Sequence, residues 1–333
     1  LPFWYWSQAC PAISLGGGGK GEGLCSWFVE TAMTRTWMVS VLIGMVVTAG
    51  WHTAAIAQGP IEQVLAATFR LSNNGKSSTA FLVWPKSGEA QGGKRAILVT
   101  AGHALKDTPD AKATLVLRAK NDDSTYCRQE VTIPVRDGKQ CLFVCHPDLD
   151  IAALPIDLPE ATAIEPLRYE QLAAMSFVEE GKLKVASEVF VPGYPATLEG
   201  NEVGWSVLRK GIIATHPLVP VQKTPKIMVN AATFGGDSGA PVVLVDGDRA
   251  VVVGIVVGMQ RQTDRASMSF QEYVSHMPMA LAITLQAPFI RETIDLLGKA
   301  EAAAAPAAEP AADAKEPADE AKQTPEAKLE PAS

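Results

Sequence analysis

Cysteine and histidine are both scarce in this sequence, which has five of each among its 333 residues. No group of them has the close spacing that a structural zinc site requires, so we expect no zinc site. Three cysteines, Cys127, Cys141 and Cys145, lie near the middle of the chain. In an exported protein, Cys127 could pair with Cys141 or Cys145 and stabilise the fold by roughly 3 kcal/mol in the chain-entropy model. Three reduced, buried thiols are the alternative.

Positively charged residues are fewer than negatively charged ones. The chain has 29 Lys and Arg against 36 Asp and Glu, a net charge of −7. Eight acids and four lysines follow Leu297, which accounts for −4, and residues 1–57 are neutral, so the remainder carries −3. No basic patch stands out, so nucleic acid is not an expected partner.

No apolar run has the length of an ordinary membrane span. The strongest run covers 37–47, which is about eleven residues. It follows a short basic start at Met33 and precedes Ala-Ile-Ala at 55–57. This pattern is typical of a secretory signal peptide, which we place at 33–57, so we expect an exported protein, periplasmic or secreted. If cleavage fails, 37–57 would act as a tilted membrane anchor.

Both ends of the sequence lack the pattern of a folded domain. Residues 1–32 precede the expected start at Met33 and show no steady periodicity, so we interpret them as translated upstream sequence or part of a longer chain. Residues 299–333 consist almost wholly of Ala, Pro, Glu, Asp and Lys, with Leu329 as the one large apolar residue. Such a segment buries too little surface to offset its ordering entropy, so we expect a disordered, solvated spacer.

The remaining body, 58–298, has little helical periodicity. Short Val- and Ile-containing runs bounded by Gly, Pro, Asn and Asp recur instead, and their length and composition favour strands. One clear helical pattern covers 289–297, where Gly298 is expected to end the helix, and a shorter helix is possible near 169–175. We therefore expect an all-β body with a C-terminal helix. The expected strands are 65–71, 80–84, 96–100, 113–117, 130–135, 188–191, 211–214, 226–231, 241–245 and 250–257.

The most informative motif is Gly-Asp-Ser-Gly-Ala-Pro at 236–241, between two apolar runs. A serine flanked by glycines at such a turn can expose its hydroxyl, but it needs a base and an orienting acid to become a nucleophile. His103, in Thr-Ala-Gly-His at a strand end, is the candidate base for Ser238. Asp150, in Asp-Ile-Ala-Ala-Leu, is the candidate acid, and Asp148 is the competing carboxylate, which we expect to be solvated. The backbone N–H groups of Gly236 and Ser238 would form an oxyanion hole.

Together these three motifs resemble the trypsin-like (chymotrypsin-fold) serine peptidases, especially their bacterial exported members. The order His103, Asp150, Ser238 matches that family's order. The resemblance implies two six-stranded antiparallel barrels, at about 60–160 and 180–285, with a catalytic cleft between them and a C-terminal helix at 288–297. It also implies a serine-type endopeptidase that acts on protein or peptide substrates and needs no metal or organic cofactor.

The sequence departs from the family in its activation signal. No Ile-Val-Gly-Gly-like new N-terminus follows a processing site, so we do not expect such a terminus to pair with Asp237. We expect Asp237 to find internal partners instead, and the enzyme to be active once folded.

The resemblance also locates a specificity pocket. In the family, the residue six positions before the nucleophile lies at the base of the pocket, which gives Ala232, followed by Thr233. Neither is charged, so we expect a small or medium apolar residue before the cut rather than Arg or Lys. Val256, Val257 and Gly258 are expected to form a pocket wall that pairs with substrate backbone.

Two other functions fit parts of this pattern. An α/β-hydrolase esterase would require Gly-x-Ser-x-Gly and the order Ser, Asp, His, whereas this chain has Ala240 at the second glycine and a different order. A catalytically silent binding module of the cell envelope, built on the peptidase fold, is the stronger alternative, because fold does not fix function.

Overall fold

The computed structural model describes residues 59–86, 95–107, 110–123, 125–159, 164–268 and 270–304. The predicted upstream segment (1–32), the predicted signal peptide (33–57) and most of the predicted tail (305–333) lie outside these ranges. Within them, no helix combines the length and apolar character needed to cross a membrane.

The first sheet is antiparallel, with seven strands in the spatial order β5-β4-β1-β2-β3-β9-β8. Its central strands β3 and β9 are buried on both faces, which explains their unbroken apolar runs. The strands are β1 (Thr68–Asn73), β2 (Lys76–Val83), β3 (Arg95–Ala101), β4 (Lys112–Lys120), β5 (Tyr126–Pro134), β8 (Val144–Cys145) and β9 (Ile151–Asp157).

This sheet corrects the expectation of a closed six-stranded barrel at 60–160. Within the described residues, edge strand β5 pairs only with β4, and edge strand β8 pairs only with β9, so the sheet stays open. The short strands β6 (Arg136–Asp137) and β7 (Gln140–Cys141) pair only with each other.

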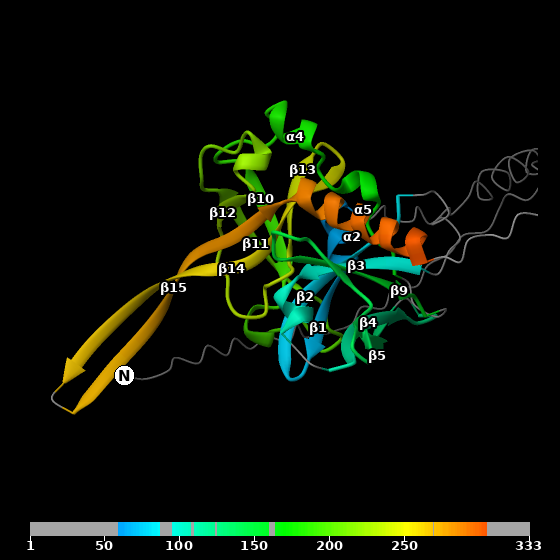
Figure 1. Ribbon diagram of the computed structural model, residues 1–333, viewed down its shortest axis with the longest axis horizontal. Coiled ribbons are helices and arrows are strands. Elements are labelled where there is room, and N and C mark those ends of the chain that lie inside the picture. Colours follow the sequence, from blue (N-terminus) through cyan, green and yellow to red (C-terminus); the bar gives the residue numbers. More distant parts are fainter. Residues whose placement is uncertain are drawn as a thin grey trace, which may run out of the picture. The chain divides into compact units, whose positions relative to one another are not determined.

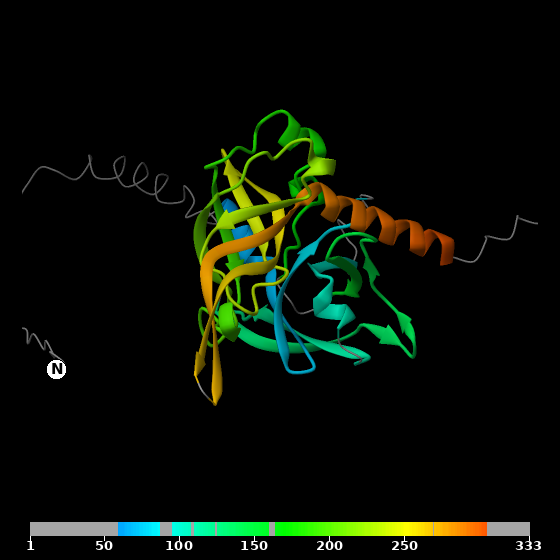
Figure 2. The ribbon, with the colours of Figure 1, turned by 60° about the vertical axis from the view of Figure 1, so that its left-hand side comes forward.

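The second sheet closes into a six-stranded antiparallel barrel in the order β10-β11-β12-β15-β14-β13, which confirms the second expected barrel. Strands β14 and β15 continue beyond the barrel as a two-stranded ribbon (residues 261–278) that projects from the body in both views (Figures 1 and 2). The strands are β10 (Glu188–Gly193), β11 (Val207–Ile213), β12 (Lys226–Asn230), β13 (Pro241–Asp246), β14 (Arg249–Met268) and β15 (Gln271–Gln286).

In the described ranges, the helices are short except for the last one. The C-terminal helix α5 (Ala287–Ala304) packs Ile290, Ile294 and Leu297 into the core, as the periodicity indicated. It does not end at Gly298, because nothing crowds that position and the following Lys-Ala-Glu-Ala run has high helix propensity. The other helices are α2 (Pro60–Ala66), α3 (His103–Lys106), α4 (Met175–Glu179) and the 3₁₀ turns η2 (Tyr169–Gln171), η3 (Pro195–Thr197) and η4 (Val221–Lys223).

Two further local expectations need correction. The expected strand at 65–71 begins only at Thr68, because Pro60 starts helix α2, which ends at Ala66. The three central cysteines are free thiols, so no disulfide joins them: Cys127 and Cys141 are exposed, and Cys145 is half-buried.

A shared apolar core holds the two sheets together. Phe81 and Val99 of the first sheet belong to the same buried cluster as Val242 and Ile255 of the barrel. A second cluster lies within the first sheet and is built around Leu98. Packing on this scale fixes the sheets relative to each other, so the loops between them have defined positions.

Candidate active site

The turn that carries Ser238 links β12 to β13 and is held from two sides. The N–H of Thr79 in β2 donates to the carbonyl of Ser238 (2.8 Å), and the N–H of Gly239 donates to the carbonyl of Val256 in β14 (2.7 Å). Gly239 has φ +93°, and a Cβ there would overlap the Thr79 carbonyl oxygen and the Thr100 hydroxyl. Only glycine meets both demands, so the motif's second glycine is set by local geometry.

His103 and Asp150 meet because the strands that carry them are neighbours. Ala101 at the end of β3 pairs with Ile151 at the start of β9, so the residues flanking this pair lie side by side. His103 Nδ1 lies 2.6 Å from Asp150 Oδ2, and the His103 backbone N–H donates to Oδ1 at 2.8 Å. Asp148, the competing acid, is exposed, as expected.

This pairing shifts the pKa values of both groups. The hydrogen bond to Asp150 raises the pKa of His103 above 6.5, against the opposing effect of burial. Burial alone would raise the pKa of the Asp150 carboxyl, but the hydrogen bonds and charge of His103 hold it below its usual value. Both side chains remain more than a third exposed, at 39% and 37%, so solvent can reach the pair.

His103, Gly236 and Ser238 line one cavity of about 400 Å³. The structure therefore brings all three predicted triad residues to one place, with Asp150 behind the imidazole. Within the described part of the chain, no hydrogen bond joins the His103 ring to the Ser238 hydroxyl. Such catalytic hydrogen bonds are often long in the free enzyme and tighten when substrate binds. The remaining lining residues are Lys76, Ser77, Ser78, Ala104, Asp107, Thr197 and Gly235.

The backbone N–H groups of Gly236 and Ser238 have no acceptor among the described residues. The surrounding peptide groups are oriented by neighbours: the Thr79 hydroxyl donates to the Gly236 carbonyl (2.8 Å), and the Ala196 N–H donates to the Gly235 carbonyl (2.6 Å). These hydrogen bonds hold the adjacent peptide groups in place, and the two predicted N–H groups, which have no acceptor among the described residues, are available for a ligand oxygen. Sequence reasoning missed Thr79, which lies 157 residues from its partner.

Asp237 is fully buried, and its partner is internal, as expected. The Arg209 guanidinium from β11 donates to both carboxylate oxygens, at 2.5 and 2.6 Å, and the Phe234 N–H donates at 2.8 Å. Arg209 also donates to the carbonyl of Ala232 (2.8 Å), so it binds both ends of the loop formed by residues 232–237. No sequence signal identified Arg209.

Ser238 also lines a second cavity, of about 290 Å³. Three predicted pocket residues, Thr233, Val256 and Gly258, line it. Ala232 and Val257 do not: Ala232 is exposed, and Val257 packs against the hydrophobic core. Sequence reasoning missed the other lining residues, which are Phe234, Gly235, Met259 and Arg261.

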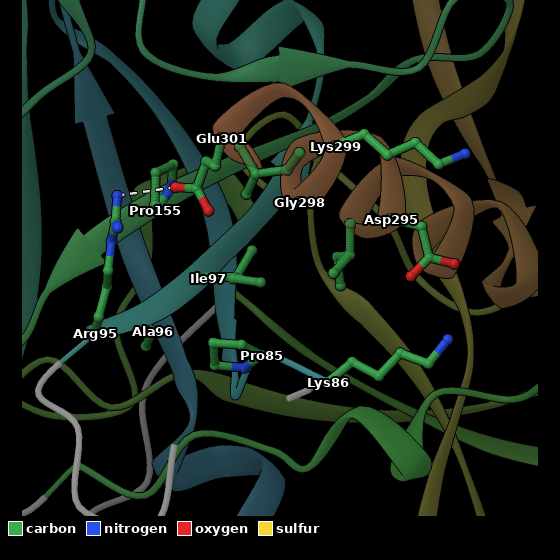
Figure 3. Close-up of a pocket in the computed structure, with 12 residues that line it drawn as sticks. Pro85, Lys86, Arg95, Ala96, Ile97, Pro155, Asp295, Gly298, Lys299 and Glu301 are labelled. Atoms are coloured by element: carbon green, nitrogen blue, oxygen red, sulfur yellow. Dashed lines mark ion pairs between the residues drawn. The ribbon is translucent and has the colours of Figure 1, made fainter. Parts of the chain in front are cut away.

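A larger cavity, of about 730 Å³, lies between β3 and α5 (Figure 3). Figure 3 shows the Arg95–Glu301 ion pair across one side of it, at 2.9 Å. Lys86, Asp295 and Lys299 also line it, but none of the predicted site residues does. Its size does not make it a reaction site, because none of the described residues that line it is a nucleophile paired with a base. In the described ranges, no three His, Cys, Asp or Glu side chains group as metal ligands.

Comparison with known proteins gives one family match. Residues 79–255 match the family described as a trypsin-like peptidase domain. Among solved structures, a serine-to-alanine mutant of Rv3671c from M. tuberculosis H37Rv, in an inactive form, is 16% identical, with a TM-score of 0.42 over 77% of this chain and 96% of that one. The Rv3671c protease in an inactive form is 15% identical, with a TM-score of 0.39 over 72% and 92%. No curated protein matches.

Proposed function

Because this chain belongs to the trypsin-like peptidase family, we propose that it is a serine endopeptidase that cleaves protein or peptide substrates. The observation that carries the proposal is the 2.6 Å contact between Asp150 and His103, which lines the same cavity as Ser238. Family membership makes a peptidase the expected activity, and this contact supplies the serine-type chemistry.

In the proposed reaction, Ser238 Oγ attacks the scissile carbonyl carbon and His103 Nε2 accepts its proton. Asp150 holds Nδ1–H, so Nε2 is left unprotonated to act as the base, and the imidazolium is stabilised. The N–H groups of Gly236 and Ser238, which have no other acceptor among the described residues, stabilise the negative charge on the carbonyl oxygen.

Collapse of the tetrahedral intermediate breaks the peptide C–N bond, and His103 donates its proton to the leaving amine. The acyl group then remains as an ester on Ser238. A water molecule attacks that ester while His103 takes its proton, and the acid product leaves with Ser238 restored. Every group in this cycle is supplied by the chain, so the proposal requires no cofactor.

The Arg209–Asp237 pair supports activity without proteolytic activation. Asp237 lies between the two proposed oxyanion donors in the sequence, and its carboxylate already accepts three hydrogen bonds, two from Arg209 and one from the Phe234 N–H. A buried carboxylate with these partners needs no new N-terminus. We therefore propose that the enzyme is active once it has folded.

The alternative is a catalytically silent binding module on the same fold. The observation in its favour is the missing His103–Ser238 hydrogen bond in the described structure. Cleavage of an unfolded protein by the full chain separates the two functions. We expect fluorescein-labelled casein to be hydrolysed by the wild type and not by Ser238→Ala. Ser176→Ala, at an exposed serine on α4, is the matched control and should retain full activity.

Equal casein hydrolysis by wild type and Ser238→Ala would contradict the serine mechanism, and no hydrolysis by a folded wild type would favour the binding module. We further propose export, which rests on the signal-like pattern at 33–57. N-terminal sequencing of protein recovered from the cell envelope or medium should begin near Gln58.

A further inference from the structure

The 290 Å³ cavity beside Ser238 has a mixed lining, to which Thr233 and Ser238 contribute hydroxyl groups. Phe234, Val256 and Met259 contribute apolar walls, and Arg261 is the one charged residue among the described residues that line it. No acidic side chain from the described part of the chain lines this cavity. A cavity that adjoins the nucleophile and holds a lone cation selects for a negative group on whatever enters it.

The backbone places Arg261 there by breaking the regular pairing of β14 with β15. The register shifts between Val256 and Gly258, and again between Met259 and Arg261. Regular alternation would put Val256 and Met259 on opposite faces of the strand, yet both line the cavity. Irregularities of this kind re-aim side chains and occur next to active sites.

The second irregularity includes a residue in a costly conformation. Ala280 on β15, opposite this stretch, has φ +54°, in the left-handed region that non-glycine residues rarely adopt. Strain of this kind persists where the surrounding structure requires it. The bend in β14 that brings Arg261 to the cavity is therefore a specified feature of the fold.

Arg261 differs from its neighbour on the ribbon in having no ion-pair partner. Arg265, four residues further along β14, has its guanidinium 3.5 Å from the carboxylate of Glu272. Within the described ranges, no carboxylate lies at ion-pair distance from Arg261. Its charge is thus available to a ligand, and a guanidinium is well suited to binding a carboxylate through two hydrogen bonds.

We propose that this cavity binds an acidic side chain, Glu or Asp, of the residue before the scissile bond, with Arg261 as the specificity-determining residue. This inference rests on the proposed function, because Ser238 must be the nucleophile for the cavity to hold that residue. It revises the expectation of an apolar residue: the walls contact the methylene groups, and Arg261 binds the carboxylate.

The test compares fluorogenic peptides that differ only before the cut, with Glu, Gln, Leu or Lys at that position. We expect the full chain to cleave the Glu peptide with kcat/KM roughly tenfold above the isosteric Gln peptide at low salt. The ratio should shrink as salt screens the pair. In Arg261→Gln it should fall to about one, and in Arg261→Glu the Lys peptide should overtake the Glu peptide.

Arg249→Gln is the matched control, because it removes the same charge from an exposed position at the other end of β14. It should leave the Glu-to-Gln ratio unchanged. Equal cleavage of Glu and Gln peptides by the wild type, or an unchanged ratio in Arg261→Gln, would overturn the assignment.

Labelling of Ser238 by a fluorophosphonate in the same samples separates two kinds of failure. Labelled enzyme without a charge preference overturns the role of Arg261 alone. A folded enzyme that neither labels nor cleaves any peptide overturns the proposed function, and this assignment with it.

Discussion

Replacing Arg209 by methionine should both destabilise the fold and impair the reaction. Arg209 donates two hydrogen bonds to Asp237 and one to the Ala232 carbonyl. Its side chain is 13% exposed, and that of Asp237 is 0% exposed. Methionine fills a similar volume but leaves the carboxylate with the Phe234 N–H as its remaining partner. A buried charge is then left without compensation.

The loss of one partner from a buried ion pair costs about 3–5 kcal/mol. With a urea dependence of about 2–3 kcal/mol per molar, the midpoint of unfolding should fall by about 1–2.5 M. Adding Asp237→Asn to the Arg209→Met variant removes the orphaned charge, so the double variant should recover part of the loss. This recovery would show that the uncompensated charge, rather than lost packing, causes the destabilisation.

Urea unfolding of the full chain, followed by circular dichroism, measures the stability. The rate of Ser238 labelling by a fluorophosphonate, taken under conditions where the variant is still folded, measures the site. That rate should also fall, because Asp237 lies between the two oxyanion donors. Arg249→Gln, which removes an exposed cation, should change neither value. A midpoint shift below about 0.3 M, or an unchanged labelling rate, would refute the reasoning.

Three further predictions concern the pH dependence, the turn glycine and the Thr79 anchor. In a pH–rate profile, wild-type kcat/KM should rise with pH, with a midpoint above pH 6.5, because the raised pKa of His103 delays loss of its proton. Asp150→Asn should lower that midpoint and should lower the plateau value of kcat/KM by about 10³–10⁴-fold. Stabilisation by this pair should be full between pH about 4 and about 6.5. It should be lost as pH rises through the raised pKa of His103, and lost in acid as pH falls through the lowered pKa of Asp150. Paired urea titrations of the wild type and Asp150→Asn can detect both losses. Gly239→Ala should lower the thermal midpoint and abolish casein hydrolysis, since its Cβ would overlap the Thr79 carbonyl; full activity in a folded variant would contradict this packing. Thr79→Val should lower kcat by about tenfold with little change in KM, because the Gly236 peptide loses its hydroxyl donor; an unchanged kcat would mean that this hydrogen bond does not orient the oxyanion donors.

The triad candidates could be predicted from sequence because each depends on local signals. His103 follows a strand, Asp150 precedes one, and Ser238 lies in a glycine-flanked turn. Short apolar runs identified most strands, since burial selects Val and Ile wherever a strand is covered. The pairing of β3 with β9 then brings His103 and Asp150 together, a step that required the fold.

Arg209 could not be predicted because its partner is distant. It lies on β11, where burial alternates along the strand, and in sequence it looks like any solvated arginine. Its role comes from Asp237, which lies 28 residues later and reaches it only after the barrel closes. Thr79 and Arg261 were missed for the same reason: their contacts depend on tertiary structure rather than on a local pattern.

The ribbon and the end of α5 are two places where local sequence patterns gave the wrong secondary structure. Residues 261–278 lack the β-branched runs that mark a buried strand, because the ribbon is largely exposed and needs no apolar alternation. Gly298 was expected to end the helix. A glycine inside a helix costs only about 1 kcal/mol relative to alanine, and the alanines that follow it offset this cost. Whether the first sheet closes into a barrel depends on whether its edge strands pair, and no local sequence pattern indicates this.

The most direct test of the account is the site and rate of covalent modification of the full chain by a fluorophosphonate, read by peptide mass spectrometry. Activation of Ser238 by His103 predicts a single adduct on Ser238, none in Ser238→Ala, and modification at least about a hundredfold slower in His103→Ala. An unmodified Ser238 in the folded wild type, or an equal rate in His103→Ala, would contradict it.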